Sequence, residues 1–278
     1  MLIRQYRSDY FDEMIGKKLM APYILKNKSY AESSIFKPEN LLRESRRQNK
    51  ITRGKVPAIC ILDPDGDLVN YLNTQCLAEK NKYWACYHSN LFTFEILGER
   101  IGIIPCAVGA SYAVLVAEQL FVSGCELLIS ITSAGIIKTQ NANKQFALIT
   151  EAIRDEGTSY HYISVDESST LSSKLISLLK GNNNLWFEAK SWTTDAPFRE
   201  TKSAIEEMKE QNVACVEMEA SALYAFGKAK NKEVICFAHL TNAMAQEEGD
   251  FEKGEYFGSL QMIHLIKEVL KKLHSWRS

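Results

Sequence analysis

The sequence predicts an α/β sandwich with a mostly parallel sheet. Short apolar runs bounded by turn residues alternate with longer segments in which apolar residues recur at three-to-four spacing. The short runs are typical of strands buried on both faces, and the longer segments are typical of helices that cover them. With 278 residues and a hydrophobic fraction of 46%, the chain is long enough to bury a large core.

Each predicted element follows from one of these patterns. Buried strands are expected at 57–62, 101–108, 127–133, 146–150 and 234–241. Helices are expected at 110–124, where Gly124 ends the pattern, and at 220–230 and 258–276. The first fifty residues are polar and basic, so we predict a largely helical N-terminal extension at 1–50 and one catalytic domain at 51–278.

Composition excludes several classes of protein. Lys plus Arg number 33 and Asp plus Glu 34, so no net charge indicates a nucleic-acid or membrane partner. No signal-like stretch opens the sequence and no window approaches 18 uncharged apolar residues, so we expect a cytoplasmic protein. The seven cysteines form no CxxC pair. Five of them lie in apolar runs and are expected in the core: Cys60, Cys106, Cys125, Cys215 and Cys236.

Three polar stretches follow predicted strands, where ligands gather in such sheets. ITSAG (131–135) is expected to be a small turn that leaves a strand. VEMEAS (216–221) places Glu217 and Glu219 around Met218 at the start of a helix. One acid there would complement the helix dipole, but two acids around a methionine also suit a vicinal diol and the apolar face of a sugar.

The third stretch, HLTN (239–242), ends in Asn242. Asn242 is either a turn former or a side chain that reads a heterocyclic base, and His239 is expected to be a core residue. A further polar cluster, SWTTDAPFRET (191–201), surrounds a proline bend and fits either a lid or a surface loop.

Together these stretches resemble the nucleoside phosphorylase-I family, which includes uridine phosphorylases, purine nucleoside phosphorylases and methylthioadenosine nucleosidases. VEMEASALYAF is similar to the family's ribose-binding signature, and ITSAG to its phosphate loop. IRDEGTSYHY, WTTDAPFRET and HLTN follow in the family's order, so the resemblance covers roughly 57–270. It implies a three-layer α/β/α sandwich with a mixed, partly barrel-like central sheet, and no metal or organic cofactor.

The resemblance also implies roles for residues. Glu219, Met218 and Glu217 would bind ribose, and Asn242 and Glu219 would be catalytic. Four residues would form the loop for phosphate or another nucleophile: Thr132, Ser133, Ala134 and Gly135. Four would bind the base: Thr194, Asp195, Arg199 and Asn242. His88 would be donated between subunits of a homodimer, or of a hexamer built as a trimer of dimers.

Two departures concern the nucleophile. The family's two phosphate-binding arginines would fall at Ile129 and at Gly66 of LDPDGD (62–67). We therefore weigh three functions: phosphorolysis of a nucleoside, with inorganic phosphate as co-substrate; hydrolysis by water; and nucleoside binding without catalysis. Overall resemblance favours the first, the missing arginines favour the second, and the intact acids disfavour the third.

Overall fold

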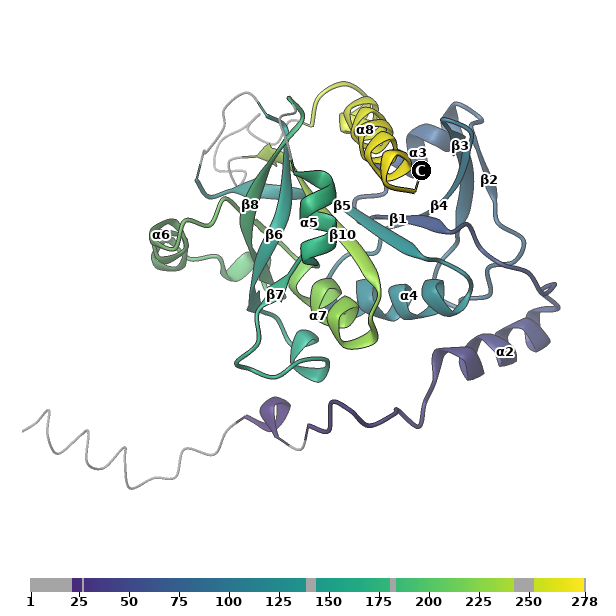
Figure 1. The fold of residues 1–278 in the computed structure, drawn as a ribbon, viewed down its shortest axis with the longest axis horizontal. Helices are drawn as coiled ribbons and strands as arrows, with labels where there is room; N and C mark the ends of the chain where they lie inside the picture. The colour runs from purple at the N-terminus through teal and green to yellow at the C-terminus, as the bar shows by residue number, and fades with distance from the viewer. Residues whose placement is uncertain (1–21, 27, 139–143, 181–183, 243–252, 278) are drawn as a thin grey trace, which may run out of the picture.

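The computed structural model describes residues 22–26, 28–138, 144–180, 184–242 and 253–277, without the side chains of Asn242 and of 275–277. Its centre is one mixed sheet of ten strands (Figure 1). The strands are β1 (Ile59–Asp63), β2 (Ala78–Lys80), β3 (Phe92–Ile96), β4 (Glu99–Pro105), β5 (Leu127–Ile136), β6 (Phe146–Asp155), β7 (Ser169–Thr170), β8 (Trp186–Thr194), β9 (Cys215–Glu217) and β10 (Glu233–Asn242).

Part of this sheet closes into a barrel. β5 pairs with both β10 and β9, and the order β10-β6-β8-β9 returns to β5. Of the ten strand pairings within the described residues, five are parallel and five antiparallel. The mixed, partly barrel-like sheet is therefore confirmed. The strand–helix alternation alone overestimated the parallel share, because β3–β4 and β10–β6 run antiparallel.

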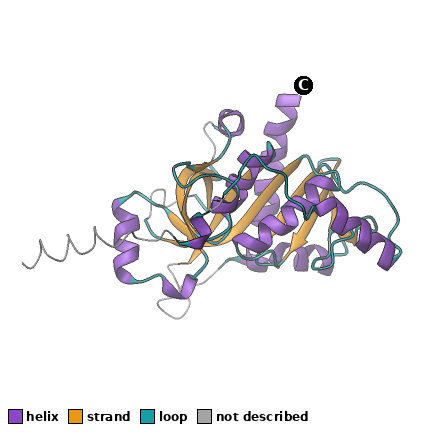
Figure 2. Ribbon diagram, turned by 90° about the horizontal axis from the view of Figure 1, so that it is seen from below, coloured by secondary structure: helices purple, strands orange, loops and turns teal. Residues whose placement is uncertain are grey.

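Helices cover both faces of the sheet (Figures 1 and 2). They are α2 (Pro38–Asn49), α3 (Asp67–Thr74), α4 (Ala110–Val122), α5 (Ser173–Leu179), α6 (Lys202–Glu210), α7 (Ala220–Lys230) and α8 (Ser259–Arg277). Short 3₁₀ turns are η1 (Tyr23–Leu25), η2 (Ser159–His161), η3 (Pro197–Arg199) and η4 (Glu255–Gly258). α4 packs against α7, while α3 and α5 both contact α8, which gives the three layers that were predicted.

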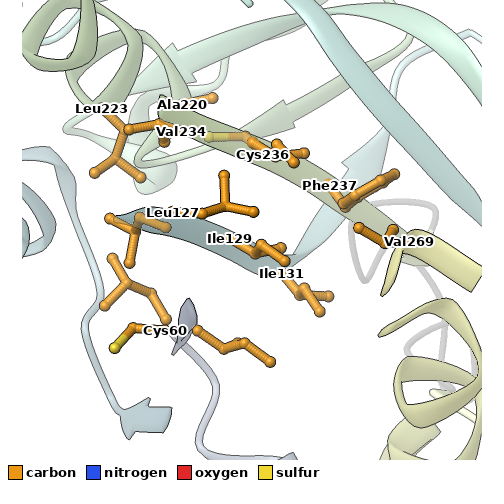
Figure 3. Packing of buried hydrophobic residues seen from close by; sticks show 14 of the residues in the cluster. Cys60, Leu127, Ile129, Ile131, Ala220, Leu223, Val234, Cys236, Phe237 and Val269 are labelled. Atoms are coloured by element: carbon orange, nitrogen blue, oxygen red, sulfur yellow. The ribbon is translucent and has the colours of Figure 1, made fainter. Parts of the chain in front are cut away.

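The core fills the space between these layers. Figure 3 shows Ile129 of β5 and Phe237 of β10 among the buried side chains, together with Leu223 of α7 and Val269 of α8. All five predicted strands and all three predicted helices are present. One core assignment is wrong: Cys106 is exposed, because it follows the last residue of β4 with a positive φ of 59°.

The N-terminal extension joins the domain through α2. This helix contacts α4, and Leu42 and Ser45 are buried between them. Residues 22–37, apart from residue 27, contain only the short turn η1 as helix. Across all the described ranges, no helix is both long enough and apolar enough to cross a membrane.

Candidate active site

The candidate site lies where two neighbours of β5 diverge. β1 pairs with Leu127–Ser130 of β5, and β9 pairs with Gly135 and Ile136 further along. Between these pairings no strand of the described chain covers that side of β5, so backbone N–H groups that point there can bind a side chain or a ligand. This gap in the pairing of β5, at residues 131–134, is called the opening below. It lies beyond the carboxyl end of β1, where ligands bind in α/β sheets.

The ITSAG segment forms this stretch of β5. It continues the strand to Ile136, so the predicted turn is wrong, because pairing with β10 and then β9 keeps the backbone extended. Thr132 is 7% exposed, and its hydroxyl lies beside the carboxylate of Glu219. Ala134 is buried, and Gly135 pairs with strands on both sides. Two groups of this segment therefore face the opening: the Thr132 hydroxyl and the backbone N–H of Ser133.

Glu217 is held entirely by the protein. Its Oε1 accepts hydrogen bonds from the hydroxyls of Ser191, at 3.0 Å, and Thr193. Its Oε2 accepts the backbone N–H groups of Glu219 and Ala220, both at 2.7 Å. Burial raises the pKa of Glu217, and these four donors oppose the shift. Glu217 thus fixes the first turn of α7 and orients Glu219.

Glu219, which precedes α7, has one carboxylate oxygen without a partner. Its Oε1 accepts the N–H of Gly109 at 2.7 Å, whereas Oε2 is buried and has no hydrogen bond. The Thr132 hydroxyl lies near the carboxylate but donates to the carbonyl of Ser133 at 3.3 Å. Burial, reinforced by the charge of Glu217, raises the pKa of Glu219 to about 8, and the Gly109 N–H and the Thr132 hydroxyl oppose this. An orphaned buried oxygen is costly, so a ligand hydroxyl is its expected partner.

A carboxylate already occupies the edge that the resemblance assigns to phosphate. Oδ2 of Asp65 accepts the N–H of Ser133 at 3.1 Å and lies 3.4 Å from Nζ of Lys253. Lys253 also pairs with Asp67 at 2.6 Å. Asp63 is 1% exposed, and burial, with Asp65 and Asp67 nearby, raises its pKa to about 7. The nucleophile side of the site is thus strongly acidic.

Neither expected arginine position fits a phosphate ligand. Ile129 is 1% exposed and packs in the core (Figure 3). Because strand side chains alternate, the residue on the same face as Thr132 is Ser130, whose buried hydroxyl has no partner. Gly66 precedes α3 with a φ of 79°, in the left-handed region that favours glycine.

The residues predicted to bind the base occupy the turn after β8. Thr194 is buried, and its hydroxyl accepts the N–H of Ala196 at 3.1 Å. Asp195 is exposed and accepts the N–H of Gly157 at 2.8 Å. Arg199 lies exposed on η3. Thr194 and Asp195 therefore brace the turn, and their contact with a base stays a prediction.

Asn242 is the last residue of β10. Its backbone lies opposite Gly135, after a register shift between Leu240 and Asn242. The side chain lies outside the part of the chain that the structure describes, so its role stays a prediction. His239, three residues earlier, is a core residue as expected: it stacks on Phe146 at 4.6 Å, and burial, with Lys253 nearby, lowers its pKa to about 4.

His88 and Met218 are the remaining residues predicted for the site, and their contact with a sugar stays a prediction. His88 is exposed, and its carbonyl accepts the hydroxyl of Tyr112 at 2.7 Å. Tyr112 lies in the first turn of α4, three residues after Gly109, so the His88 loop is tied to the helix start that contacts Glu219. Met218 is half-buried between the two acids.

Comparison with known proteins identifies the family. A family model described as the phosphorylase superfamily matches residues 58–271. The chain belongs to this superfamily. A guanosine phosphorylase of Halorubrum lacusprofundi is 21% identical over 188 residues, covering 65% of this chain and 76% of that protein. An uncharacterized protein of Acanthamoeba polyphaga mimivirus is 26% identical over 188 residues, covering 62% of this chain and 72% of the relative.

A solved structure shares the fold of this chain. Uridine phosphorylase from Vibrio fischeri, complexed with 6-hydroxy-1-naphthoic acid, matches with a TM-score of 0.65 at 19% identity. The match covers 80% of this chain and 92% of that chain. Membership of this superfamily supports an enzyme that cleaves the glycosidic bond of a nucleoside.

Sequence reasoning missed five residues of the site: Asp65, Gly109, Ser191, Thr193 and Lys253. Two had a usable signal, because LDPDGD concentrates acids after a strand and a glycine precedes the helix at 110. The others depend on long-range contacts. Within the described ranges, no group of three or more His, Cys, Asp or Glu side chains is placed to hold a metal ion.

Proposed function

We propose that this protein cleaves the N-glycosidic bond of a nucleoside and that water is the nucleophile. Water is favoured over phosphate because the Asp65 carboxylate accepts the backbone N–H of Ser133. The family resemblance placed phosphorolysis first, and the acidic edge of β5 supports the hydrolytic alternative.

Electrostatics disfavour phosphate at this position. Phosphate carries between one and two negative charges near neutral pH and is normally bound by guanidinium groups and free backbone N–H groups. Here Ser133 offers its N–H to Asp65, and the ammonium of Lys253 lies between Asp65 and Asp67. A phosphate anion would have to displace one carboxylate and approach another. A neutral water molecule has no such penalty.

The remaining groups fit cleavage through an oxocarbenium-like state. The free Oε2 of Glu219 would accept a ribose hydroxyl, and Gly109 and Glu217 would keep the carboxylate in place. Asp65 would hold the attacking water and accept its proton. Asn242 would bind the departing base. The protein would supply positioning and charge stabilisation, with no covalent intermediate.

A panel of nucleosides tests this proposal. Each nucleoside is incubated with the enzyme in phosphate buffer and in phosphate-free buffer, and the sugar product is identified. We expect free ribose at the same rate in both buffers. Strict dependence on phosphate, with sugar 1-phosphate as the product, would restore phosphorolysis. Tight nucleoside binding without base release would favour a binding protein.

Asn242 is expected to set the preference for the base. An amide offers both a donor and an acceptor, which suits a 6-oxopurine or uracil, whereas a protonated aspartate suits N7 of adenine. We expect inosine, guanosine or uridine to be cleaved faster than adenosine. Asn242→Asp should shift kcat/KM toward 6-aminopurines, and Asn242→Ala should slow every base. A silent Asn242→Ala variant would show that this residue only forms a turn.

The protein is expected to be a homodimer or a hexamer built from dimers, with His88 reaching a neighbouring site. His88 is exposed and its loop is tied to α4 beside the site, which suits a donated residue. Sedimentation velocity would show the oligomeric state. The His88→Ala variant should have a lower kcat/KM but the same oligomeric state as the wild type. A fully active monomer would rule this expectation out.

A further inference from the structure

Among the lysines and arginines that form ion pairs between described residues, Lys253 has the least exposed side chain. Its side chain is 11% exposed and its ammonium lies 2.6 Å from Asp67 and 3.4 Å from Asp65. The next most sheltered lysine or arginine in an ion pair between described residues is Lys190, at 28%. Exposed pairs contribute little to stability, whereas loss of one partner from a sheltered pair leaves an uncompensated charge.

The backbone after Lys253 is shaped to bring it there. Four residues of the next five have left-handed φ values, at 85° for Gly254, 49° for Tyr256, 54° for Phe257 and 78° for Gly258. This conformation is costly for Tyr256 and Phe257, and it persists only where surrounding contacts fix it.

Three contacts fix this turn against α3 and β10. The ring of Tyr256 lies 5.2 Å from that of Tyr71 in α3. The hydroxyl of Ser259 donates to the carbonyl of Asp67 at 3.2 Å. Gly258 packs so closely on His239 that an added Cβ would lie 2.4 Å from the ring. The turn thus holds the ammonium between Asp65, which precedes α3, and Asp67, which begins it.

The charges around Lys253 come from three directions. Asp63 ends β1, Asp65 and Asp67 precede and begin α3, and Glu219 lies across the opening beside Thr132. His239 of β10 faces the turn and is neutral near pH 7, since its pKa is about 4. Within the described ranges, Asp65 contacts the positive charge of Lys253 and the backbone N–H of Ser133.

We propose that Lys253 is a positioning residue for the nucleophile side, which holds the Asp65 carboxylate against the Ser133 N–H and compensates its charge. This proposal rests on the proposed hydrolytic function. Lys253 itself would not touch the substrate. It would act by fixing where Asp65 places the attacking water.

Three variants test this role: Lys253→Met, Lys253→Arg and, as the matched control, Lys271→Met. Lys271 pairs with Glu268 on α8, and its side chain is 59% exposed. We expect Lys253→Met to lower kcat for nucleoside cleavage by about 10- to 100-fold with a smaller change in KM. Lys253→Arg should recover most of the rate, and Lys271→Met should match the wild type. Wild-type kcat in Lys253→Met would overturn the proposal.

A double variant separates positioning from charge balance. Lys253→Met with Asp67→Asn removes one surplus negative charge, and we expect it to restore the melting temperature but not kcat. If kcat returns together with stability, Lys253 only balances charge and the proposal is wrong.

A measurement without substrate tells this failure apart from failure of the proposed function. Lys253→Met should be destabilised more at pH 8 than at pH 5, because Asp63, whose pKa burial raises to about 7, is protonated at pH 5 but at pH 8 adds a negative charge beside Asp65 and Asp67. If the wild-type enzyme cleaves no nucleoside, hydrolysis is wrong, and this difference still tests the contact. An equal loss of stability at pH 5 and pH 8 would contradict the proposed contact between Lys253 and the aspartates.

Discussion

Glu219→Gln is expected to lower kcat/KM for nucleoside cleavage by at least two orders of magnitude while the fold stays intact. The amide keeps its one oxygen for the Gly109 N–H and places an NH₂ group, which donates, where the free Oε2 would accept a sugar hydroxyl. Losing the hydrogen bond to the sugar hydroxyl costs about 0.5–1.5 kcal/mol in binding alone, and loss of transition-state stabilisation adds to it. The same variant should discriminate less against 2′-deoxynucleosides.

The same substitution should raise stability at alkaline pH. The pKa of Glu219 is raised to about 8 in the folded protein, mainly by burial, from an ordinary value of 4.5. Ionising this buried group therefore costs stability as the pH rises from about 4.5 through 8. Glu219→Gln removes that cost, so its melting temperature should exceed that of the wild type at pH 8 and approach it at pH 5.

Glu118→Gln is the matched control. Glu118 accepts the hydroxyl of Tyr162 at 2.6 Å on α4, away from the opening. The Glu118→Gln variant should retain wild-type kinetics. If Glu219→Gln instead shows wild-type kinetics on ribonucleosides, the sugar lies elsewhere.

Asp65→Asn is expected to lower kcat by about 100- to 10,000-fold, the usual contribution of a general base. The amide can still accept the Ser133 N–H, but it cannot take a proton from water. KM should change much less, because the sugar and the base are bound by other residues. Steady-state kinetics across a pH series would measure both effects.

Asp166→Asn, in an exposed loop, is the control and should behave as the wild type. Phosphate is the second variable. Removing the charge of Asp65 should allow phosphate to inhibit the variant at concentrations that leave the wild type unaffected. An Asp65→Asn enzyme with wild-type kcat would show that this carboxylate only anchors the Ser133 backbone.

The sequence predicted the layers of this fold because short, purely apolar runs and longer amphipathic segments carry strong local signals. It did not predict β7 or β8 as strands. β7 has two residues, and the nine residues of β8 include polar Glu188, Lys190 and Ser191, which interrupt any apolar run. The barrel closure could not be derived from local patterns, because it depends on β5 pairing with distant β10 and β9.

The candidate site was predicted on one side only. Glu217, Met218, Glu219 and Thr132 are local to two motifs, and the structure brings these motifs together. In LDPDGD, the sequence comparison drew attention to the arginine that is absent at Gly66. It gave no sign that the carboxylate of Asp65 would contact the Ser133 N–H. Lys253 lies 188 residues from Asp65 in sequence, and no local signal connects them.

The most direct test of the account is the origin of the oxygen on the sugar product. The enzyme is incubated with a cleaved nucleoside in oxygen-18 water that contains unlabelled phosphate at millimolar concentration, and the sugar is analysed promptly by mass spectrometry. A no-enzyme sample of ribose corrects for exchange with solvent. Hydrolysis predicts free ribose that carries one heavy oxygen from the first product detected. Ribose 1-phosphate without heavy oxygen would contradict it.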